Sequence, residues 1–154
     1  MTYRHDNNCH KKNSSGCHGV HPKCSDNILI TNLEEIAEKN DHYRKVVWTA
    51  RCMQITVMCI PECSDIGVEI HEDTDQIIRV EQGYGSVRMG ASRNDLCFTK
   101  NVCPGDIICA PAGTWHNVIN TGNCPLKLSS IYSPPHHPRD AVQRTKSSGE
   151  GMAY

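Results

Sequence analysis

The sequence predicts an all-β domain, an antiparallel sandwich or barrel, with one short helix near its N-terminal end. Apolar and polar residues alternate with a period of two from Lys45 to Tyr132. β-Branched residues are concentrated in the same region, for example in Gln54–Ile60. Turn residues such as Pro104 and Gly105 interrupt the alternation at short intervals, which is typical of sandwiches and barrels.

Length and composition indicate one domain with a core of its own. The chain has 154 residues, a formal net charge of -1 and 5% aromatic residues. The near-zero charge and few aromatics argue against a nucleic-acid-binding surface. Neither a membrane-spanning apolar run nor a signal-peptide core is present, so we expect a cytoplasmic protein without nucleic-acid or membrane partners.

Both ends of the chain are polar. We expect residues 1–27 to form a flexible tail, residues 28–138 the β-barrel domain and residues 139–154 a second flexible tail. The first tail contains residues that could bind zinc: Cys9, His10, Cys17, His18, His21 and Cys24. Their spacing contains no C-x2-C pair, so zinc binding there is the alternative to simple disorder.

The chain contains ten cysteines. In a chain of this size without a signal segment, we expect them to be reduced rather than paired in disulfides. Cys52, Cys59, Cys97 and Cys109 stand in apolar runs, where we expect them to be buried as small hydrophobic residues.

The elements follow one another at short intervals. Ile28–Ile30 could form a short strand, and Thr31 to Glu34 resemble a capping box that begins a helix ending near Lys39. The strands that follow are expected at 46–50, 54–60, 65–71, 76–81, 86–89, 96–99, 107–110, 115–120 and 126–132.

The segment from Gly67 to Gly83 carries the residues most suited to bind a metal. It contains Glu69, His71, Asp73, Asp75 and Gln76 between two strand-like runs, which we expect to pair as a hairpin. Alternation places Glu69 and His71 on one face. Asp73 and Asp75 are expected in the connecting turn, although a register that uses one of them as a ligand is an alternative.

A second motif begins at Gly105. The run GDIICAPAGTWHNVIN has the pattern G-x5-P-x-G-x2-H-x3-N, formed by Gly105, Pro111, Gly113, His116 and Asn120. This pattern matches the second conserved motif of the cupin family at every defined position. Counted back from Gly83, the first cupin motif places Glu69, His71 and Gln76 where the family has His, His and Glu. The chain therefore resembles a small single-domain cupin, similar to the mannose-6-phosphate-isomerase-like group with an RmlC-like jelly roll.

The resemblance implies a double-stranded β-helix that holds one divalent transition metal: Fe, Mn, Zn, Ni or Co. The implied ligands are Glu69, His71, Gln76 and His116, which keep the single negative charge of the usual set of three His and one Glu. The alternative is that both histidines are core residues and that Glu69 pairs with an arginine, Arg79 or Arg88. His136 and His137 are expected to be solvated loop histidines, because adjacent residues of an extended chain point to opposite faces.

By resemblance, we expect a metal-dependent enzyme acting on a small oxygenated substrate, such as a sugar or sugar-phosphate isomerase. A Fe- or Mn-dependent dioxygenase and a non-catalytic ligand-binding cupin are the alternatives, and the sequence assigns no catalytic residue. The expected pocket walls are Gln54, Met58, Trp48, Trp115 and Tyr132. We also expect a homodimer formed through Ile28–Ile30 and Val46–Trp48.

Overall fold

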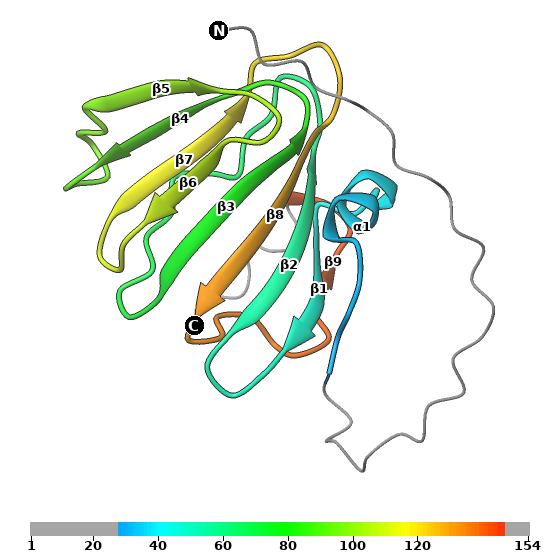
Figure 1. Ribbon diagram of the computed structural model, residues 1–154. Coiled ribbons are helices and arrows are strands. Elements are labelled where there is room, and N and C mark those ends of the chain that lie inside the picture. Colours follow the sequence, from blue (N-terminus) through cyan, green and yellow to red (C-terminus); the bar gives the residue numbers. More distant parts are fainter. Residues whose placement is uncertain (1–27, 147–154) are drawn as a thin grey trace, which may run out of the picture.

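Two antiparallel sheets face each other in the protein, as a computed structural model of residues 28–146 shows (Figure 1). The larger sheet has the strand order β6-β3-β8-β2-β1-β9 and the smaller has the order β5-β4-β7. This arrangement confirms the predicted all-β jelly roll. The strands are β1 (Arg44–Thr49), β2 (Gln54–Ile60), β3 (Asp75–Gln82), β4 (Gly85–Gly90), β5 (Phe98–Val102), β6 (Ile107–Ala110), β7 (Trp115–Asn120), β8 (Leu126–Ser133) and β9 (Val142–Gln143).

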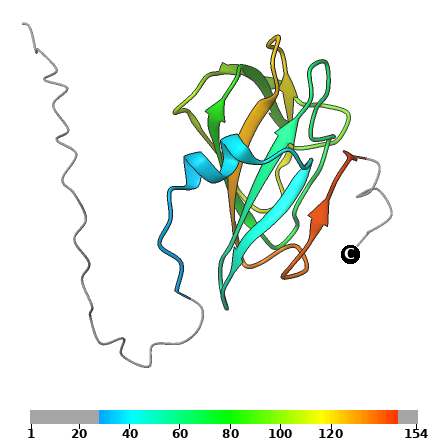
Figure 2. The ribbon, with the colours of Figure 1, turned by 90° about the vertical axis from the view of Figure 1, so that its right-hand side faces the viewer.

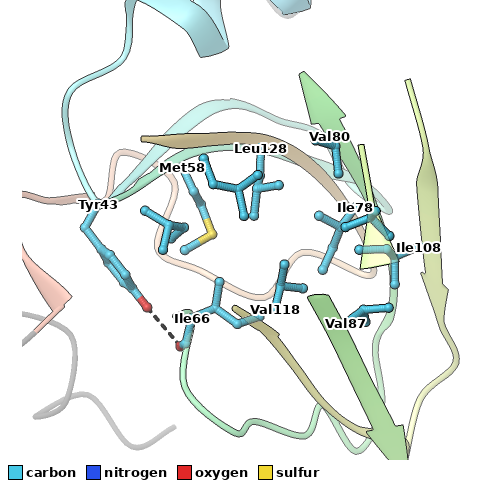
Figure 3. Close-up of a cluster of buried hydrophobic side chains, with 12 residues drawn as sticks. Tyr43, Met58, Ile66, Ile78, Val80, Val87, Ile108, Val118 and Leu128 are labelled. Carbon is cyan, nitrogen blue, oxygen red and sulfur yellow. Dashed lines mark hydrogen bonds between the residues drawn. The ribbon is translucent and has the colours of Figure 1, made fainter. Parts of the chain in front are cut away.

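The core lies between the two sheets (Figure 3). Met58 and Leu128 come from the large sheet, Val87 and Val118 from the small one. Inward-facing side chains alternate with outward-facing ones along each strand, as the period-two pattern predicts. Tyr43 closes one end, where its hydroxyl donates a hydrogen bond to the carbonyl of Ile66 at 2.9 Å.

The helix α1 (Leu33–Lys39) packs on β8, β2 and β3, outside the barrel (Figure 2). Its N-cap is Asn32, whose side chain accepts a hydrogen bond from the backbone of Glu35, so the capping residue lies one position after the predicted Thr31. Ile28–Ile30 do not form the expected strand, and 93% of Ile30 is exposed. Within residues 28–146, no helix has the length and apolarity needed to cross a membrane.

The segment 65–71 differs from the predicted hairpin. It forms isolated bridges with β7, Asp65 to Ile119 and Glu69 to His116, whereas β3 pairs with β6 and β8. The two halves of the first motif therefore lie on opposite sides of the barrel. Alternation predicts which face a side chain occupies but does not identify the partner strand.

The ordered chain continues past the predicted boundary at residue 138. Val142 and Gln143 form β9, which pairs with β1, so this part of residues 139–154 is not a loose tail. Residues 1–27 and 147–154 lie outside the described residues, as do the predictions for the Cys/His-rich tail.

The seven cysteines of residues 28–146 are all free, as expected for reduced thiols. Their predicted burial is wrong for Cys52, Cys97 and Cys109, which are exposed, while Cys59 is half-buried. Cys109 lies on β6, an edge strand, and its side chain points away from the core.

Candidate metal centre

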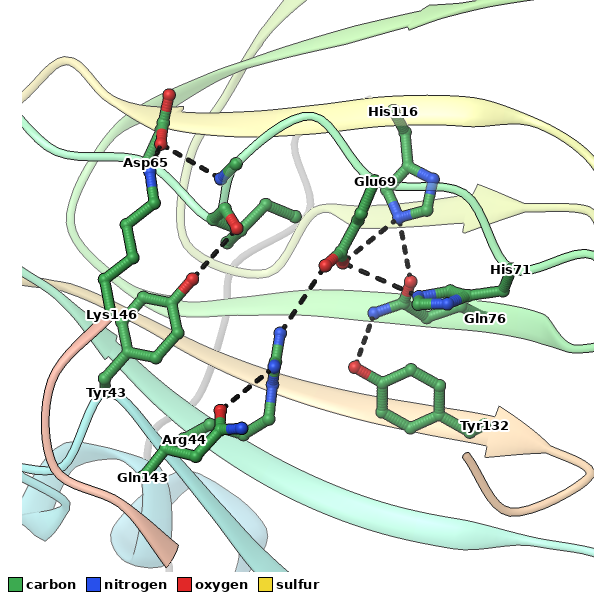
Figure 4. A network of polar contacts seen from close by, with 12 residues as sticks. Tyr43, Arg44, Asp65, Glu69, His71, Gln76, His116, Tyr132, Gln143 and Lys146 are labelled. Atoms are coloured by element: carbon green, nitrogen blue, oxygen red, sulfur yellow. Dashed lines mark hydrogen bonds and ion pairs between the residues drawn. The ribbon is translucent and has the colours of Figure 1, made fainter. Parts of the chain in front are cut away.

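Glu69, His71 and His116 meet inside the barrel (Figure 4). Their ligand atoms all lie within 4.8 Å of one another. The backbones of Glu69 and His116 exchange two hydrogen bonds of 2.9 Å, which fixes the two side chains side by side. Gly113 holds His71 close to this pair, because the Gly113 N–H donates to the carbonyl of His71 at 2.8 Å.

Gly113 has a φ of +75°, in the left-handed region that favours glycine. This turn directs the chain from β6 into β7 and brings His116 under the segment that carries His71. Gly113 of the second motif is thus needed for the geometry of the site.

The oxygen of Glu69 that faces the cluster, Oε1, lies 3.5 Å from His116 Nε2 and 3.6 Å from His71 Nε2. Gln76, on β3, places its Oε1 2.9 Å from His116 Nε2. Its amide N–H donates to the hydroxyl of Tyr132 at 3.0 Å, so the carbonyl end points at the cluster. All four predicted ligands therefore converge on one place.

The cluster contains more acceptors than donors. His116 Nδ1 lies 2.9 Å from the carbonyl of Thr114, and donating a proton there leaves Nε2 of the neutral ring as a lone pair facing Gln76 and Glu69. Within the described chain, Glu69 Oε1 and both ring nitrogens of His71 are buried without a hydrogen-bond partner. Such an arrangement suits a cation at this place, and the tautomer of His116 that donates to Thr114 is the one that leaves Nε2 able to bind a metal.

The pKa values of Glu69 and His116 are consistent with a cation at this place. Burial raises the pKa of Glu69, but His116, His71 and Arg44 outweigh it and hold that pKa well below its usual range. Burial lowers the pKa of His116, but Glu69 and the Thr114 carbonyl raise it by more. Glu69 is thus a permanent anion that favours positive charge at the cluster.

Arg44, on β1, was not found from the sequence, because no motif includes it. Its Nη2 lies 3.6 Å from Glu69 Oε2, and Nη1 donates to Gln143 on β9 at 3.1 Å. Burial lowers the pKa of Arg44, but Tyr132 and Glu69 raise it by more, so the guanidinium stays charged.

His136 and His137 are not solvated loop histidines, contrary to the prediction. The ring centroid of His136 lies 4.1 Å from that of His71, and the His137 ring is 5.0 Å from Tyr132. Gln54 causes this placement: its Oε1 accepts hydrogen bonds from the backbone N–H of both residues, and its amide donates to the carbonyl of His137. An extended-chain argument fails here because the segment after β8 folds back over the barrel opening.

The predicted pocket walls separate into two groups. Tyr132 contacts the cluster through Gln76, and Gln54 reaches it through the histidine segment. Met58 packs in the core. Trp48 lies with Leu29, Leu33 and Ile55 under the N-terminal segment, and Trp115 faces away from its neighbour His116, with Arg93 above its ring.

Comparison with known proteins agrees with both motifs. The cupin domain family matches residues 56–132. The chain belongs to the cupin family. This cupin is 48% identical over 119 residues to an uncharacterized protein, YrkC, of Bacillus subtilis strain 168, covering 77% of this chain and 64% of YrkC. The chain thus spans less than two thirds of the length of that relative.

Solved structures show the same architecture. The crystal structure of BH2720 from Bacillus halodurans is 44% identical, with a TM-score of 0.79 over 88% of this chain and 98% of that one. An RmlC-like cupin from Shewanella frigidimarina is 16% identical, with a TM-score of 0.52 over 61% of this chain and 77% of that one, which shows the fold alone. These likenesses establish a small cupin, and the mannose-6-phosphate-isomerase-like assignment stays a prediction.

Proposed function

We propose that this cupin binds one divalent transition metal through Glu69, His71 and His116, with the Gln76 carbonyl as a fourth ligand. We further propose that it is an enzyme acting on a small oxygenated substrate by proton transfer, as in sugar isomerisation. The convergence of four lone-pair-bearing atoms on one buried point supports metal binding. Two imidazoles, one carboxylate and one amide oxygen suit Fe, Mn, Ni, Co or Zn, and their relative affinities follow the Irving–Williams order.

The neighbouring residues supply what the metal ligands lack. A bound divalent ion would supply Lewis-acid polarisation of a carbonyl oxygen. Glu69, as a ligand, is not free to act as a base. His136 lies beside His71, and burial followed by the charge of His71 lowers its pKa to about 4. Its ring is therefore neutral at pH 7, and although so low a pKa makes it a weak base, its place beside His71 is what supports a role in proton transfer.

The decisive experiment combines elemental analysis with a substrate screen. Purified protein should contain close to one transition-metal ion per chain, and Glu69→Gln and His116→Ala should lose it. Metal-loaded protein is then tested for aldose–ketose exchange on a panel of sugars, sugar acids and sugar phosphates. Exchange that disappears in His136→Gln while the metal stays bound supports the proposal. Silence over the whole panel would refute isomerisation.

A second candidate is an oxygen-using iron or manganese enzyme. The meeting of two imidazoles and one carboxylate at one place is the feature that favours it. Oxygen uptake that depends on both Fe(II) and a substrate, and is absent in His116→Ala, would select this function. A protein that binds metal without turnover in either assay would be a ligand-binding module.

A further inference from the structure

A second group of charged residues lines a pocket beside the cluster. The pocket has a volume of about 330 Å3 and includes Tyr43, Arg44, Glu69, Arg93 and Lys146 in its wall. Of the four charged side chains among its described lining residues, three are basic and only Glu69 is acidic. We call it the Arg44 pocket. Its one acid is also a candidate metal ligand, so the pocket and the cluster share a wall (Figure 4).

Arg44 is built into this wall rather than laid on the surface. Only 9% of its side chain is exposed. Gln143 of β9 accepts a hydrogen bond from Nη1, while Nε is buried and has no hydrogen-bond partner among the described residues. A guanidinium carries five N–H donors in a planar fork, and burying them without acceptors is costly. The residue therefore retains donor capacity that the described chain does not use.

The charge balance points the same way. Among residues 28–146, Glu69 is the only carboxylate that lies against Arg44, at 3.6 Å. A divalent ion on the cluster would set two further positive charges against the same carboxylate, while the imidazoles and the amide of Gln76 would be neutral. Lys146 at the rim is paired with Asp65, but Arg93 adds another positive charge. The loaded site would thus carry an excess of positive charge, which a bound anion would reduce.

From these observations we infer that the Arg44 pocket binds the carboxylate group of the substrate. The substrate class is a small carboxylic acid that bears a hydroxyl or carbonyl group, such as a hydroxy acid or a sugar acid. A carboxylate fits because its two oxygens match the edge of the guanidinium that carries Nε and Nη2, the edge that Gln143 does not occupy. The Arg44 anchor lies next to Glu69, so an anchored acid would place its neighbouring oxygen toward the cluster. The substrate class rests on the proposed function, whereas the anion pocket itself does not.

The C-terminal segment takes part in the pocket. Gln143 holds the guanidinium, and Lys146 lies in the wall, where it binds Asp65. Both residues follow the part of the chain that matches the family, residues 56–132. The pocket is therefore formed in part by residues outside the matched domain. Gln143 acts as a positioning residue, because it touches Arg44 and not the pocket.

Calorimetric titration of the full chain with glycolate tests the inference. We expect glycolate to bind the metal-free protein, and Arg44→Gln to weaken it at least tenfold. Arg51→Gln, which changes an exposed arginine elsewhere, should leave it unchanged. Ethylene glycol, which lacks the carboxylate, should not bind. Arg44→Lys keeps the charge without the fork and should give intermediate affinity, and thermal melting confirms that each variant is folded.

Metal-loaded protein completes the test. Metal and glycolate should each raise the affinity for the other by the same factor, since binding linkage is reciprocal. Equal glycolate affinity in the wild type and a folded Arg44→Gln or Arg44→Lys would overturn the inference. Inorganic phosphate binding more tightly than glycolate would overturn the choice of a carboxylate. If no metal binds but glycolate binding still depends on Arg44, the proposed function fails while the anion pocket stands.

Discussion

Gln76 and His116 meet across the barrel, with the amide oxygen 2.9 Å from Nε2 of the imidazole. The Gln76 amide is held from behind by Tyr132, whose hydroxyl accepts its N–H at 3.0 Å. Gln76 is 2% exposed, so its amide cannot turn to water instead. The orientation of a neutral ligand is thus set by a buried phenol on the neighbouring strand.

This relationship predicts the effect of Tyr132→Phe. The substitution conserves volume but leaves the Gln76 amide without its partner, so the carbonyl is no longer fixed toward the cluster. Loss of such a supporting hydrogen bond lowers metal affinity by roughly 10-fold or more. Competition with a fluorescent chelator measures the change. Tyr84→Phe, at an exposed tyrosine, is the matched control, and unchanged affinity in Tyr132→Phe would show that Gln76 does not contribute to the metal site.

Metal binding should also stabilise the fold. A ligand that binds only the folded state at 100 times its Kd adds about 2.7 kcal/mol to the free energy of unfolding. We expect Mn(II) or Zn(II) to raise the melting temperature of the wild type but not that of Glu69→Gln or His116→Ala. Asp73→Asn changes an exposed acid in the preceding turn and should melt like the wild type with metal. An equal rise in all four proteins would indicate binding elsewhere.

Asn120, the last residue of the second motif, should be important for stability. Its two amide N–H bonds are shared among three carbonyls, those of Ile60, Pro61 and Cys124, which lie 3.0, 3.1 and 2.8 Å from Nδ2. Asn120→Ala leaves these acceptors without that donor in a buried place and should cost roughly 3 kcal/mol. Urea unfolding measures the change. Asn101→Ala, at an exposed position of β5, should change the free energy of unfolding little. An equal decrease in both variants would mean that the hydrogen bonds of Asn120 are not what stabilises the fold.

The histidines after β8 predict how the stability of the metal-free protein depends on pH. Burial, with the charge of His71, lowers the pKa of His136 to about 4, and burial, with the charge of Arg44, lowers that of His137 to about 3. The unfolded chain takes up protons on both rings below about pH 6.5, while the folded chain does not. The free energy of unfolding should therefore rise with pH between about 4.5 and about 6.5.

Unfolding in urea at several pH values measures this slope. His136→Gln and His137→Gln should each flatten it, and His42→Gln, whose ring lies outside this cluster, should leave it as in the wild type. The window lies above the usual range of carboxyl groups and below the range in which the raised pKa of His116 acts. A slope that persists when His136→Gln and His137→Gln are combined in one protein would mean that other groups control the transition.

The sequence predicted the barrel and the ligand set for different reasons. Alternation sets the bounds of strands such as Gln54–Ile60, which agree with the structure. The resemblance of Gly105–Asn120 to the second cupin motif predicted His116, and the structure shows the positive φ of Gly113 in the turn before its strand. Arg44 and His136 belong to no local pattern. They reach the cluster through contacts with Gln143 and Gln54 that are 99 and 82 residues apart in sequence, and local periodicity carries no information at that range.

The N-terminal segment motivates a last prediction, a homodimer. Ile28 and Ile30 are 65% and 93% exposed, and Leu29 lines an apolar pocket with Trp48 and Ile55. Apolar side chains exposed side by side are unfavourable in water, and a second copy could cover them. We expect light scattering to give twice the chain mass of 17.2 kDa.

Ile30→Asp should give the monomer, because a carboxylate buried in that contact would lose its hydration. Ile107→Asp changes an equally apolar exposed residue on β6 and should remain dimeric. A wild type that is monomeric at high concentration would refute the dimer, and dissociation by Ile107→Asp alone would move the contact to the β6 edge.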